Sequence, residues 1–294
     1  MESLFGYCGI SRQGHYKKLS NERKWADLEY LVVGQMLQLR ELHPGMGLRS
    51  MYEVLKPQGL GRDAFVSIGI RYGFRLVVYK NPVKTTFSSP YSRYKNLLVD
   101  VKLDNVGQLW TSDITYFNVG DKVYYIVMIM DVYSRKIVGY TVADNMRAEN
   151  NCEALKMAFT VRKQTVFSEL IHHSDRGGQY ISNDYVAMLN QAQIKISMCN
   201  EVHENAHIER VNGTIKNQYL RYRNIIDFED LKAQLKRAID AYNDSKPHAA
   251  LQGMSPNVFE CFIKELKDEK RPKLSIWTCN ETKNINPNQC IIQF

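Results

Sequence analysis

The chain has 294 residues, of which 44% are hydrophobic and 24% are charged, a composition typical of folded globular proteins. Lys and Arg number 39 against 31 Asp and Glu, and this basic excess favours a polyanionic partner such as nucleic acid. The longest apolar run, Val123 to Met130, is well short of the roughly 18 residues that a membrane helix needs. The opening Met1-Glu2-Ser3 lacks the basic and apolar stretches of a secretion signal. We therefore expect a cytoplasmic protein without a membrane segment.

The cysteines are scattered along the chain and show neither a C-x-x-C pair nor a Cys/His spacing typical of zinc sites. We interpret them as reduced thiols rather than as disulfide partners or metal ligands. They are Cys8, Cys152, Cys199, Cys261, Cys279 and Cys290.

The charge is unevenly distributed. Residues 1–104 carry 16 basic and 9 acidic side chains, residues 105–215 carry 10 and 12, and residues 216–294 carry 13 and 10. A slightly acidic middle between two basic flanks suggests a core that performs chemistry and flanks that hold a phosphate backbone. Ordinary variation in surface charge is the alternative interpretation.

Residues 1–79 are predicted to form a helical region. Apolar residues recur at helical spacing from Trp25 to Leu42, and short helices are predicted from Leu48 to Leu55 and from Arg62 to about Tyr72. Three short helices joined by Pro/Gly turns are typical of a helix-turn-helix unit, in which Arg62 and Arg71 face DNA bases or phosphates. Many three-helix domains bind no DNA, so this alternative stays open. Residues 80–104 show no sustained period and are interpreted as a linker.

Residues 105–260 are predicted to form a mixed α/β sheet with helices on both faces. The predicted strands are 109–117, 122–130, 136–142, 170–173 and 195–198, of which the first three form an antiparallel meander. Helices are predicted over 147–163, 182–193, 205–222 and 228–242, with Ser182 and Asp227 as N-caps. Residues 261–294 are assigned to a C-terminal tail.

Three acidic residues stand in unusual settings. Asp113 interrupts an apolar strand, Asp175 follows another strand, and Glu209 lies in the first turns of the 205–222 helix. A buried strand tolerates an aspartate only when its charge is paired or bound to metal, and converging carboxylates repel one another. If the three converge, a divalent cation with oxygen ligands, Mg²⁺ or Mn²⁺, compensates them. Taken singly, each is also explained as an ordinary carboxylate at the end of a strand or the start of a helix.

Five motifs in fixed order resemble the DDE transposases of bacterial insertion sequences, and most closely the group with a retroviral-integrase-like catalytic core. The resemblance covers about residues 30 to 260. The motifs are Trp110–Tyr116, Asp131–Gly139, His173–Ser182, Glu204–Glu209 and Tyr242–Pro256.

This resemblance implies a ribonuclease H-like core in which Asp113, Asp175 and Glu209 bind two metal ions for cutting and joining DNA strands. It also implies that Lys216 grips the transposon-end DNA from the same helix face as Glu209, a face that Asn205 shares. The expected partners are double-stranded DNA, further copies of the chain, and a protein from an upstream reading frame joined by frameshifting.

The chain departs from the family pattern at three places. The interval from Asp175 to Glu209 is 34 positions, about two fewer than usual for the family, and the shortening falls in the Cys199–His203 segment. Glu204 replaces the usual Asp, and Lys246 replaces a common Arg.

Other candidate residues have plainer interpretations. His173 is expected to order the turn before Asp175 rather than act as a nuclease base, and Asp131 to cap the Ser134-Arg135 turn. Tyr133, Tyr180 and Tyr185 pack in a core or stack on DNA bases. Two other functions stay open: a non-catalytic DNA-binding regulator derived from a transposase, and a nuclease that cuts RNA–DNA hybrids.

Overall fold

The computed structural model describes residues 5, 7, 9–77, 93–199 and 202–276. The chain divides into two compact units, Met1–Tyr79 and Lys80–Phe294. Within the described residues, no helix combines the length and the apolar character needed to cross a membrane.

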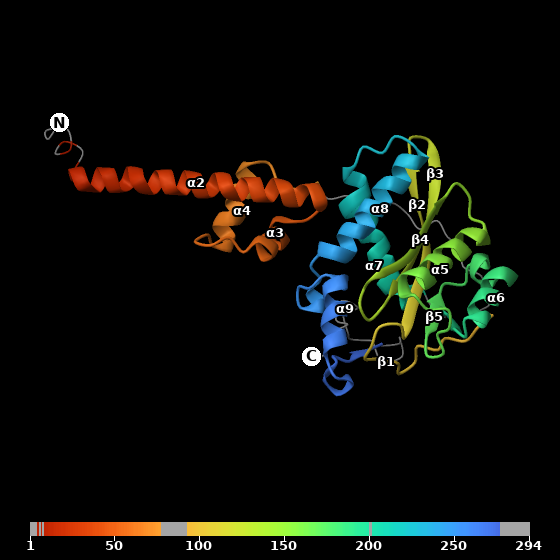
Figure 1. The fold of residues 1–294 in the computed structure, drawn as a ribbon. Helices are drawn as coiled ribbons and strands as arrows, with labels where there is room; N and C mark the ends of the chain where they lie inside the picture. The colour runs from red at the N-terminus through yellow and green to blue at the C-terminus, as the bar shows by residue number, and fades with distance from the viewer. Residues whose placement is uncertain (1–4, 6, 8, 78–92, 200–201, 277–294) are drawn as a thin grey trace. The chain divides into compact units, whose positions relative to one another are not determined.

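The elements given with bounds in the first unit are the helices α2 (Arg12–Leu42), α3 (Leu48–Leu55) and α4 (Arg62–Arg71) (Figure 1). Helix α2 begins well before the predicted Trp25. Its first turn is capped by Ser11, whose Oγ accepts a hydrogen bond from the Gly14 amide at 3.0 Å. Apolar periodicity missed this half of the helix because only the second half packs on α3 and α4, through residues such as Val32 and Met36.

The second unit is built on a five-stranded sheet in the order β4-β3-β2-β5-β6. Strands β2 (Leu109–Val119), β3 (Lys122–Asp131) and β4 (Ile137–Ala143) are antiparallel neighbours. Strands β5 (Ile171–Ser174) and β6 (Lys195–Met198) add to β2 in parallel. The predicted antiparallel meander is therefore confirmed.

Helices cover both faces of this sheet (Figure 1). On one face, α5 (Ala148–Arg162) and α6 (Asn183–Gln191) bury Leu155 and Leu189 against Trp110. On the other, α7 (Ala206–Thr214), α8 (Phe228–Ser245) and α9 (Pro256–Glu265) pack against the core that contains Met128. Short helical turns span Gly178–Ile181, Val202–Asn205, Ile215–Tyr219, Leu220–Tyr222, Ala249–Leu251 and Asp268–Lys270.

The predicted α/β class and the ribonuclease H-like arrangement of a mixed sheet between two helical layers are confirmed, together with a helical N-terminal region. The predicted N-caps are confirmed as well. Ser182 Oγ accepts from the Tyr185 amide at 3.4 Å, and Asp227 Oδ1 accepts from the Asp230 amide at 2.8 Å.

Parts of the expected linker and tail pack on the core of the second unit. Strand β1 (Lys102–Leu103) pairs with β7 (Leu274–Ser275), and the side chains of Leu98, Leu103 and Leu274 are buried in the same core. The boundary expected at residue 260 falls inside α9. Two-residue strands are too short to produce a recognisable sequence pattern. The rest of the expected linker, 80–92, and of the tail, 277–294, lies outside the described residues.

A buried ionic cluster joins β3, α5 and α9. The Arg162 guanidinium donates to Asp131 Oδ2 at 2.9 Å and to both Glu260 oxygens at 2.8 and 2.9 Å. Asp131 also accepts from the Ser134 amide at 3.1 Å, which confirms its predicted role in that turn. Burial raises the pKa of Asp131, whereas hydrogen bonds and charge from Arg162 outweigh burial and lower the pKa of Glu260.

Replacing Arg162 by Met leaves two buried carboxylates without their shared cation. Arg162→Met is therefore expected to lower the free energy of unfolding by about 3–5 kcal/mol, measured by urea denaturation at pH 7. Lys156→Met, on the exposed face of the same helix, is the control and stays within about 0.5 kcal/mol of the wild type. Equal stabilities of the two variants would contradict a structural role for the cluster.

Candidate active site

Strand register brings Asp113 and Asp175 together. Ser112 of β2 lies opposite Ser174 of β5 in a parallel pair, so Asp113 and Asp175 follow at the next position along the two chains. Residues in matching positions of neighbouring parallel strands point to the same side of the sheet. The two carboxylates therefore project from adjacent points of the sheet.

Helix α7 is anchored on β2 beside these aspartates. Asn205, just before the helix, donates from Nδ2 to the Ser112 carbonyl at 3.1 Å. One turn beyond Glu209, Asn212 donates from Nδ2 to Asp113 Oδ2 at 2.7 Å. These two contacts hold the exposed Glu209 over the strand that carries Asp113. Sequence inspection did not single out Asn212, because its contact depends on how the helix meets the strand.

The Asp113 carboxyl is destabilised in its charged form. Burial raises its pKa, and the negative charges of Asp175 and Glu209 raise it further, to about 7. The hydrogen bond from Asn212 opposes this shift without cancelling it. Since such effects fall off with distance, the three carboxylates predicted to converge lie in one electrostatic neighbourhood.

Asp175 is held by the turn that follows it. Its Oδ1 accepts from the Gly177 amide at 3.0 Å, which opposes the increase in pKa caused by burial of the carboxyl. A Cβ atom at position 177 would lie 3.0 Å from the same oxygen. Glycine therefore permits the close approach of the backbone to the carboxylate.

The donor set suits a hard divalent cation. Three carboxylates offer oxygen ligands only, as Mg²⁺ and Mn²⁺ prefer, and their mutual repulsion is relieved by a cation. Among the residues that the structure describes, no three His, Cys, Asp or Glu side chains are arranged closely enough to hold a metal ion. Two of the carboxylates are held instead by Asn212 and the Gly177 amide, so full coordination requires local side-chain rotation.

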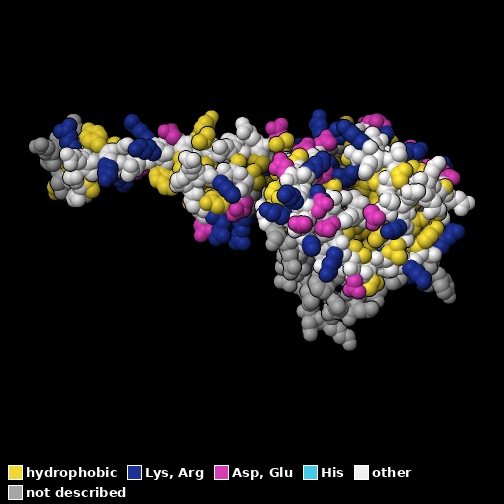
Figure 2. Space-filling model, turned by 60° about the horizontal axis from the view of Figure 1, so that its bottom comes forward, with side chains coloured by type: hydrophobic (Ala, Val, Ile, Leu, Met, Phe, Trp, Pro, Cys, Tyr) yellow, Lys and Arg dark blue, Asp and Glu magenta, His cyan; other side chains and the backbone are white. Residues whose placement is uncertain are grey.

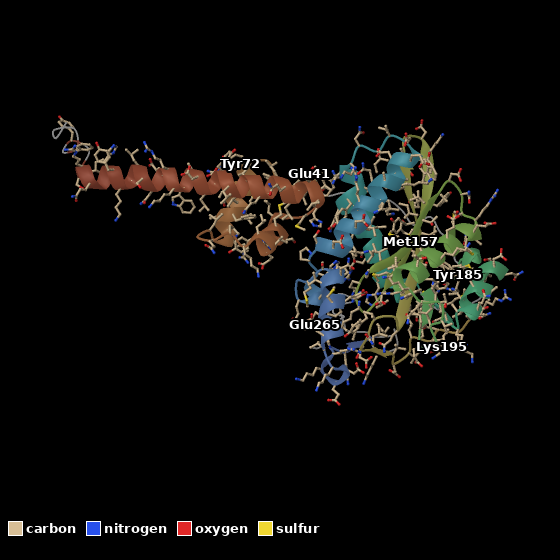
Figure 3. The ribbon with its side chains drawn as sticks, in the orientation of Figure 1. Glu41, Tyr72, Met157, Tyr185, Lys195 and Glu265 are labelled. Atoms are coloured by element: carbon tan, nitrogen blue, oxygen red, sulfur yellow. The ribbon has the colours of Figure 1, made fainter. Side chains whose placement is uncertain are left out.

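The neighbouring histidines and tyrosines are structural. His173 shares a hydrogen bond with Ser197 Oγ at 2.8 Å, and its other ring nitrogen lies 3.1 Å from Cys199 Sγ. Tyr185 of α6, labelled in Figure 3, bonds the His172 ring at 2.9 Å. Burial lowers the pKa of His173 to about 4, which keeps the ring neutral. The prediction that His173 orders this region is confirmed, and Tyr133, Tyr180 and Tyr185 are core residues.

Lys216 lies beside Asp113, although the helix that carries it is irregular. The predicted continuous helix 205–222 changes to a π-helical turn over Ile215–Tyr219. Lys216 Nζ is 3.5 Å from the Tyr116 carbonyl oxygen and 5.1 Å from the centre of that ring. Burial lowers the pKa of Lys216, and the charge of Asp113 acts in the opposite direction.

The exposed side of α7 borders an open depression that contains Glu209. Its lining is mostly small or polar, which suits a hydrated, charged ligand. The lining residues are Ala206, Glu209, Arg210, Gly213, Thr214, Asn217 and Gln218.

The other predicted DNA-binding residues are placed differently. The buried Asn205 turns its amide inward to Ser112, so it faces β2 rather than solvent. Arg62 and Arg71 lie at the two ends of α4 in the first unit. Arg62 pairs with Asp63 at 3.2 Å, and Arg71 with Glu29 at 2.7 Å.

Comparisons with known proteins agree with these features. Models of an integrase core domain match residues 104–203 and 190–256. An uncharacterised 31 kDa protein of insertion element IS600 from Shigella sonnei is 31% identical over 268 residues, covering 85% of this chain and 95% of that protein. Transposase InsF of insertion sequence IS3A from Escherichia coli strain K12 is 32% identical over 170 residues, covering 56% of this chain and 58% of its own length.

Solved structures show weaker similarity. The HTLV-2 integrase catalytic core domain in complex with magnesium, in its dimeric form, matches with 17% identity and a TM-score of 0.42, covering 53% of this chain and 97% of that one. A chain in the structure of the simian T-cell lymphotropic virus intasome in complex with PP2A regulatory subunit B56 gamma matches with 14% identity and a TM-score of 0.45, covering 76% of this chain and 73% of that one.

The raised pKa of Asp113 predicts a pH-dependent stability in EDTA. Burial and the charges of Asp175 and Glu209 raise the pKa of this carboxyl to about 7 in the folded state, so the folded state binds the extra proton below pH 7 and loses this stability as pH rises through 7. Asp113→Asn is expected to flatten this slope and to raise the unfolding temperature at pH 8 by at least about 2 °C, measured by circular dichroism.

Asp121→Asn is the matched control, because Asp121 is exposed in the turn between β2 and β3. Its unfolding temperature follows the wild type at every pH. If the unfolding temperature of Asp113→Asn depended on pH as that of the wild type does, burial and neighbouring charges would not be raising the pKa of Asp113.

Proposed function

The chain belongs to the insertion-sequence transposases with an integrase core domain, and from this membership we propose that it cuts and joins DNA strands in a metal-dependent reaction. It frees a 3′-hydroxyl at the ends of its element by hydrolysis and uses that hydroxyl to attack a second phosphodiester. The reaction needs no covalent protein intermediate, since water and the 3′-hydroxyl are the nucleophiles.

The observation that carries this proposal is the shared electrostatic neighbourhood of Asp113, Asp175 and Glu209. After local side-chain rotation, the carboxylates from β2, the end of β5 and α7 would be the ligands of two divalent cations. Such ions would supply charge stabilisation for the scissile phosphate and the leaving oxygen. We do not assign His172 or His173 as a general base, because both rings are buried and burial lowers their pKa values.

Two of the three carboxylates have a positioning group. Asn212 fixes one oxygen of Asp113, and the Gly177 amide fixes one oxygen of Asp175. Glu209 borders the open depression along α7, where a DNA strand can approach. Lys216, close to Asp113, offsets the negative charge of this region and contacts a backbone phosphate of the transposon end.

The proposed partners are double-stranded DNA at the element ends and at the target, further copies of the chain, and a protein from an upstream reading frame. Arg62 and Arg71 are proposed to contact DNA from the helical first unit. Both side chains are more than half exposed. Asn205 acts on DNA indirectly, because its side chain holds the start of α7 on β2.

The amide variants Asp113→Asn, Asp175→Asn and Glu209→Gln test the catalytic assignment. Each removes a ligand charge while keeping the side-chain shape, so strand cleavage and strand transfer on oligonucleotide ends with Mg²⁺ are expected to fall at least about 10²-fold. DNA affinity, measured by fluorescence anisotropy, is expected to be retained. Asp121→Asn and Glu153→Gln, at exposed positions, are controls with wild-type activity.

The same assay separates the other two functions. Wild-type protein that binds ends without cutting them would favour a non-catalytic regulator. Cleavage of an RNA–DNA hybrid without strand transfer would favour the nuclease. Undiminished transfer in any of the three amide variants would remove that residue from the active site.

Lys216→Ala tests the proposed phosphate contact. Loss of one contact is expected to weaken binding of end DNA and to reduce the slope of log K against log salt by about 1. Lys195→Ala, exposed on β6, is the control with an unchanged slope. A wild-type slope in Lys216→Ala would show that Lys216 only supports Tyr116.

A further inference from the structure

Residues 16–27 of α2 bury no side chain against the described part of their own unit. Every side chain from residue 16 to residue 27 is exposed, and the buried residues of α2 are Val32 and Met36. Helical segments of this length are marginal in water when nothing packs on them. A contact from another molecule would supply the missing stabilisation.

An apolar stripe runs along α2 beside the buried face formed by Val32 and Met36, and one of its members, Val33, packs in part on the unit's own core. Its seven positions alternate in steps of three and four, the spacing of a coiled-coil seam, and six of them are apolar. The side chains of Tyr16, Leu19, Tyr30 and Leu37 are 55%, 37%, 84% and 59% exposed. Figure 2 shows hydrophobic side chains interspersed with Lys and Arg along this helix. The stripe comprises Tyr16, Leu19, Arg23, Ala26, Tyr30, Val33 and Leu37.

The two halves of the stripe differ in charge. Residues 25–37 contain no Lys or Arg and two acidic residues, of which Glu29 pairs with Arg71 inside the unit and Asp27 is exposed. An antiparallel copy of α2 brings the basic half against the half that carries Asp27, whereas a parallel copy in register places the two basic halves together. Residues 12–24 contain one acidic residue, Glu22, and five basic residues: Arg12, Lys17, Lys18, Arg23 and Lys24.

Gly34 adds a separate indication of close contact. A glycine inside a helix costs about 1 kcal/mol relative to alanine, and a Cβ atom at Gly34 would meet no described atom within 4 Å. Packing inside the unit therefore gives no reason for the glycine. It is exposed beside the stripe, one turn after Tyr30 and one turn before Leu37, where a second helix backbone can approach.

We propose that the α2 stripe is a self-association surface that binds α2 of a second copy in an antiparallel, two-fold symmetric pair. The same surface serves both copies, as a two-fold interface requires. The pairing is independent of the carboxylate site, since it involves the first unit alone.

Sedimentation equilibrium of the full chain in EDTA, without DNA, tests the proposal. The wild type is expected to dimerise at about 50 µM chain, and Tyr30→Glu and Leu37→Glu each to raise the dimer Kd at least about tenfold. Leu31→Glu is the matched control, because Leu31 is 57% exposed on the same helix but lies off the stripe. Its Kd stays at the wild-type value.

Gly34→Gln tests whether a weaker dimer only reflects loss of folding, since Gln favours a helix more than Gly does. It is expected to keep or raise the unfolding temperature while weakening the dimer. Raising NaCl from about 0.05 to 0.5 M is expected to weaken association, because antiparallel pairing brings opposite charges together. A wild-type chain that stays monomeric at this concentration would contradict the proposed surface, and so would a dimer whose Kd is unchanged by both Glu substitutions. Stronger association in high salt would contradict the antiparallel orientation.

Discussion

Repulsion among three carboxylates is the constraint around which the catalytic unit is arranged. Asp113 lies inside a strand, where its charge is costly, and Asp175 and Glu209 increase that cost. The fold tolerates the arrangement because polar groups hold the carboxylates: the Asn212 amide bonds Asp113, and the Gly177 backbone amide bonds Asp175. Stability sacrificed at such a site is a common feature of catalytic centres.

The sheet and the ionic cluster stabilise the unit and so offset the cost of these charges. Parallel pairing of β2 with β5 fixes the aspartates at neighbouring positions. Far from them, Arg162 joins Asp131 to Glu260 and thereby ties three elements of the unit together. In that cluster Arg162 binds both carboxylates, whereas the three carboxylates of the candidate site retain a net repulsion that a divalent cation would relieve.

Local patterns predicted most of the regular elements. Alternating β-branched and aromatic residues predicted β2 and β3, and helix 48–55 was predicted with the bounds that the structure shows. Features that depend on distant residues were not predictable from one sequence. Three contacts join residues about 100 or more positions apart in the sequence, which no local pattern reveals. They are the Arg162–Glu260 pair, the β1–β7 pairing and the Asn212–Asp113 hydrogen bond. The prediction missed the polar start of α2, because that part of the helix carries no apolar stripe that faces the core.

The charge distribution acquires a more specific meaning from the structure. In the first unit, part of the basic excess is concentrated in the N-terminal half of α2, where every side chain from residue 16 to residue 27 is exposed. Within the second unit, residues 105–215 carry 12 acidic against 10 basic side chains, and these acidic residues include the three coupled carboxylates, beside which Lys216 lies. Basic flanks thus accompany a slightly acidic centre.

Mn²⁺ binding to the full chain, followed by water-proton relaxation between pH 6 and 8, tests the central claim most directly. The coupled carboxylates predict that Mn²⁺ binding near pH 7 releases protons. They also predict that the double variant Asp113→Asn/Glu209→Gln binds Mn²⁺ at least about tenfold more weakly. Mn²⁺ affinity and proton release that are the same in the wild type and the double variant would contradict the account.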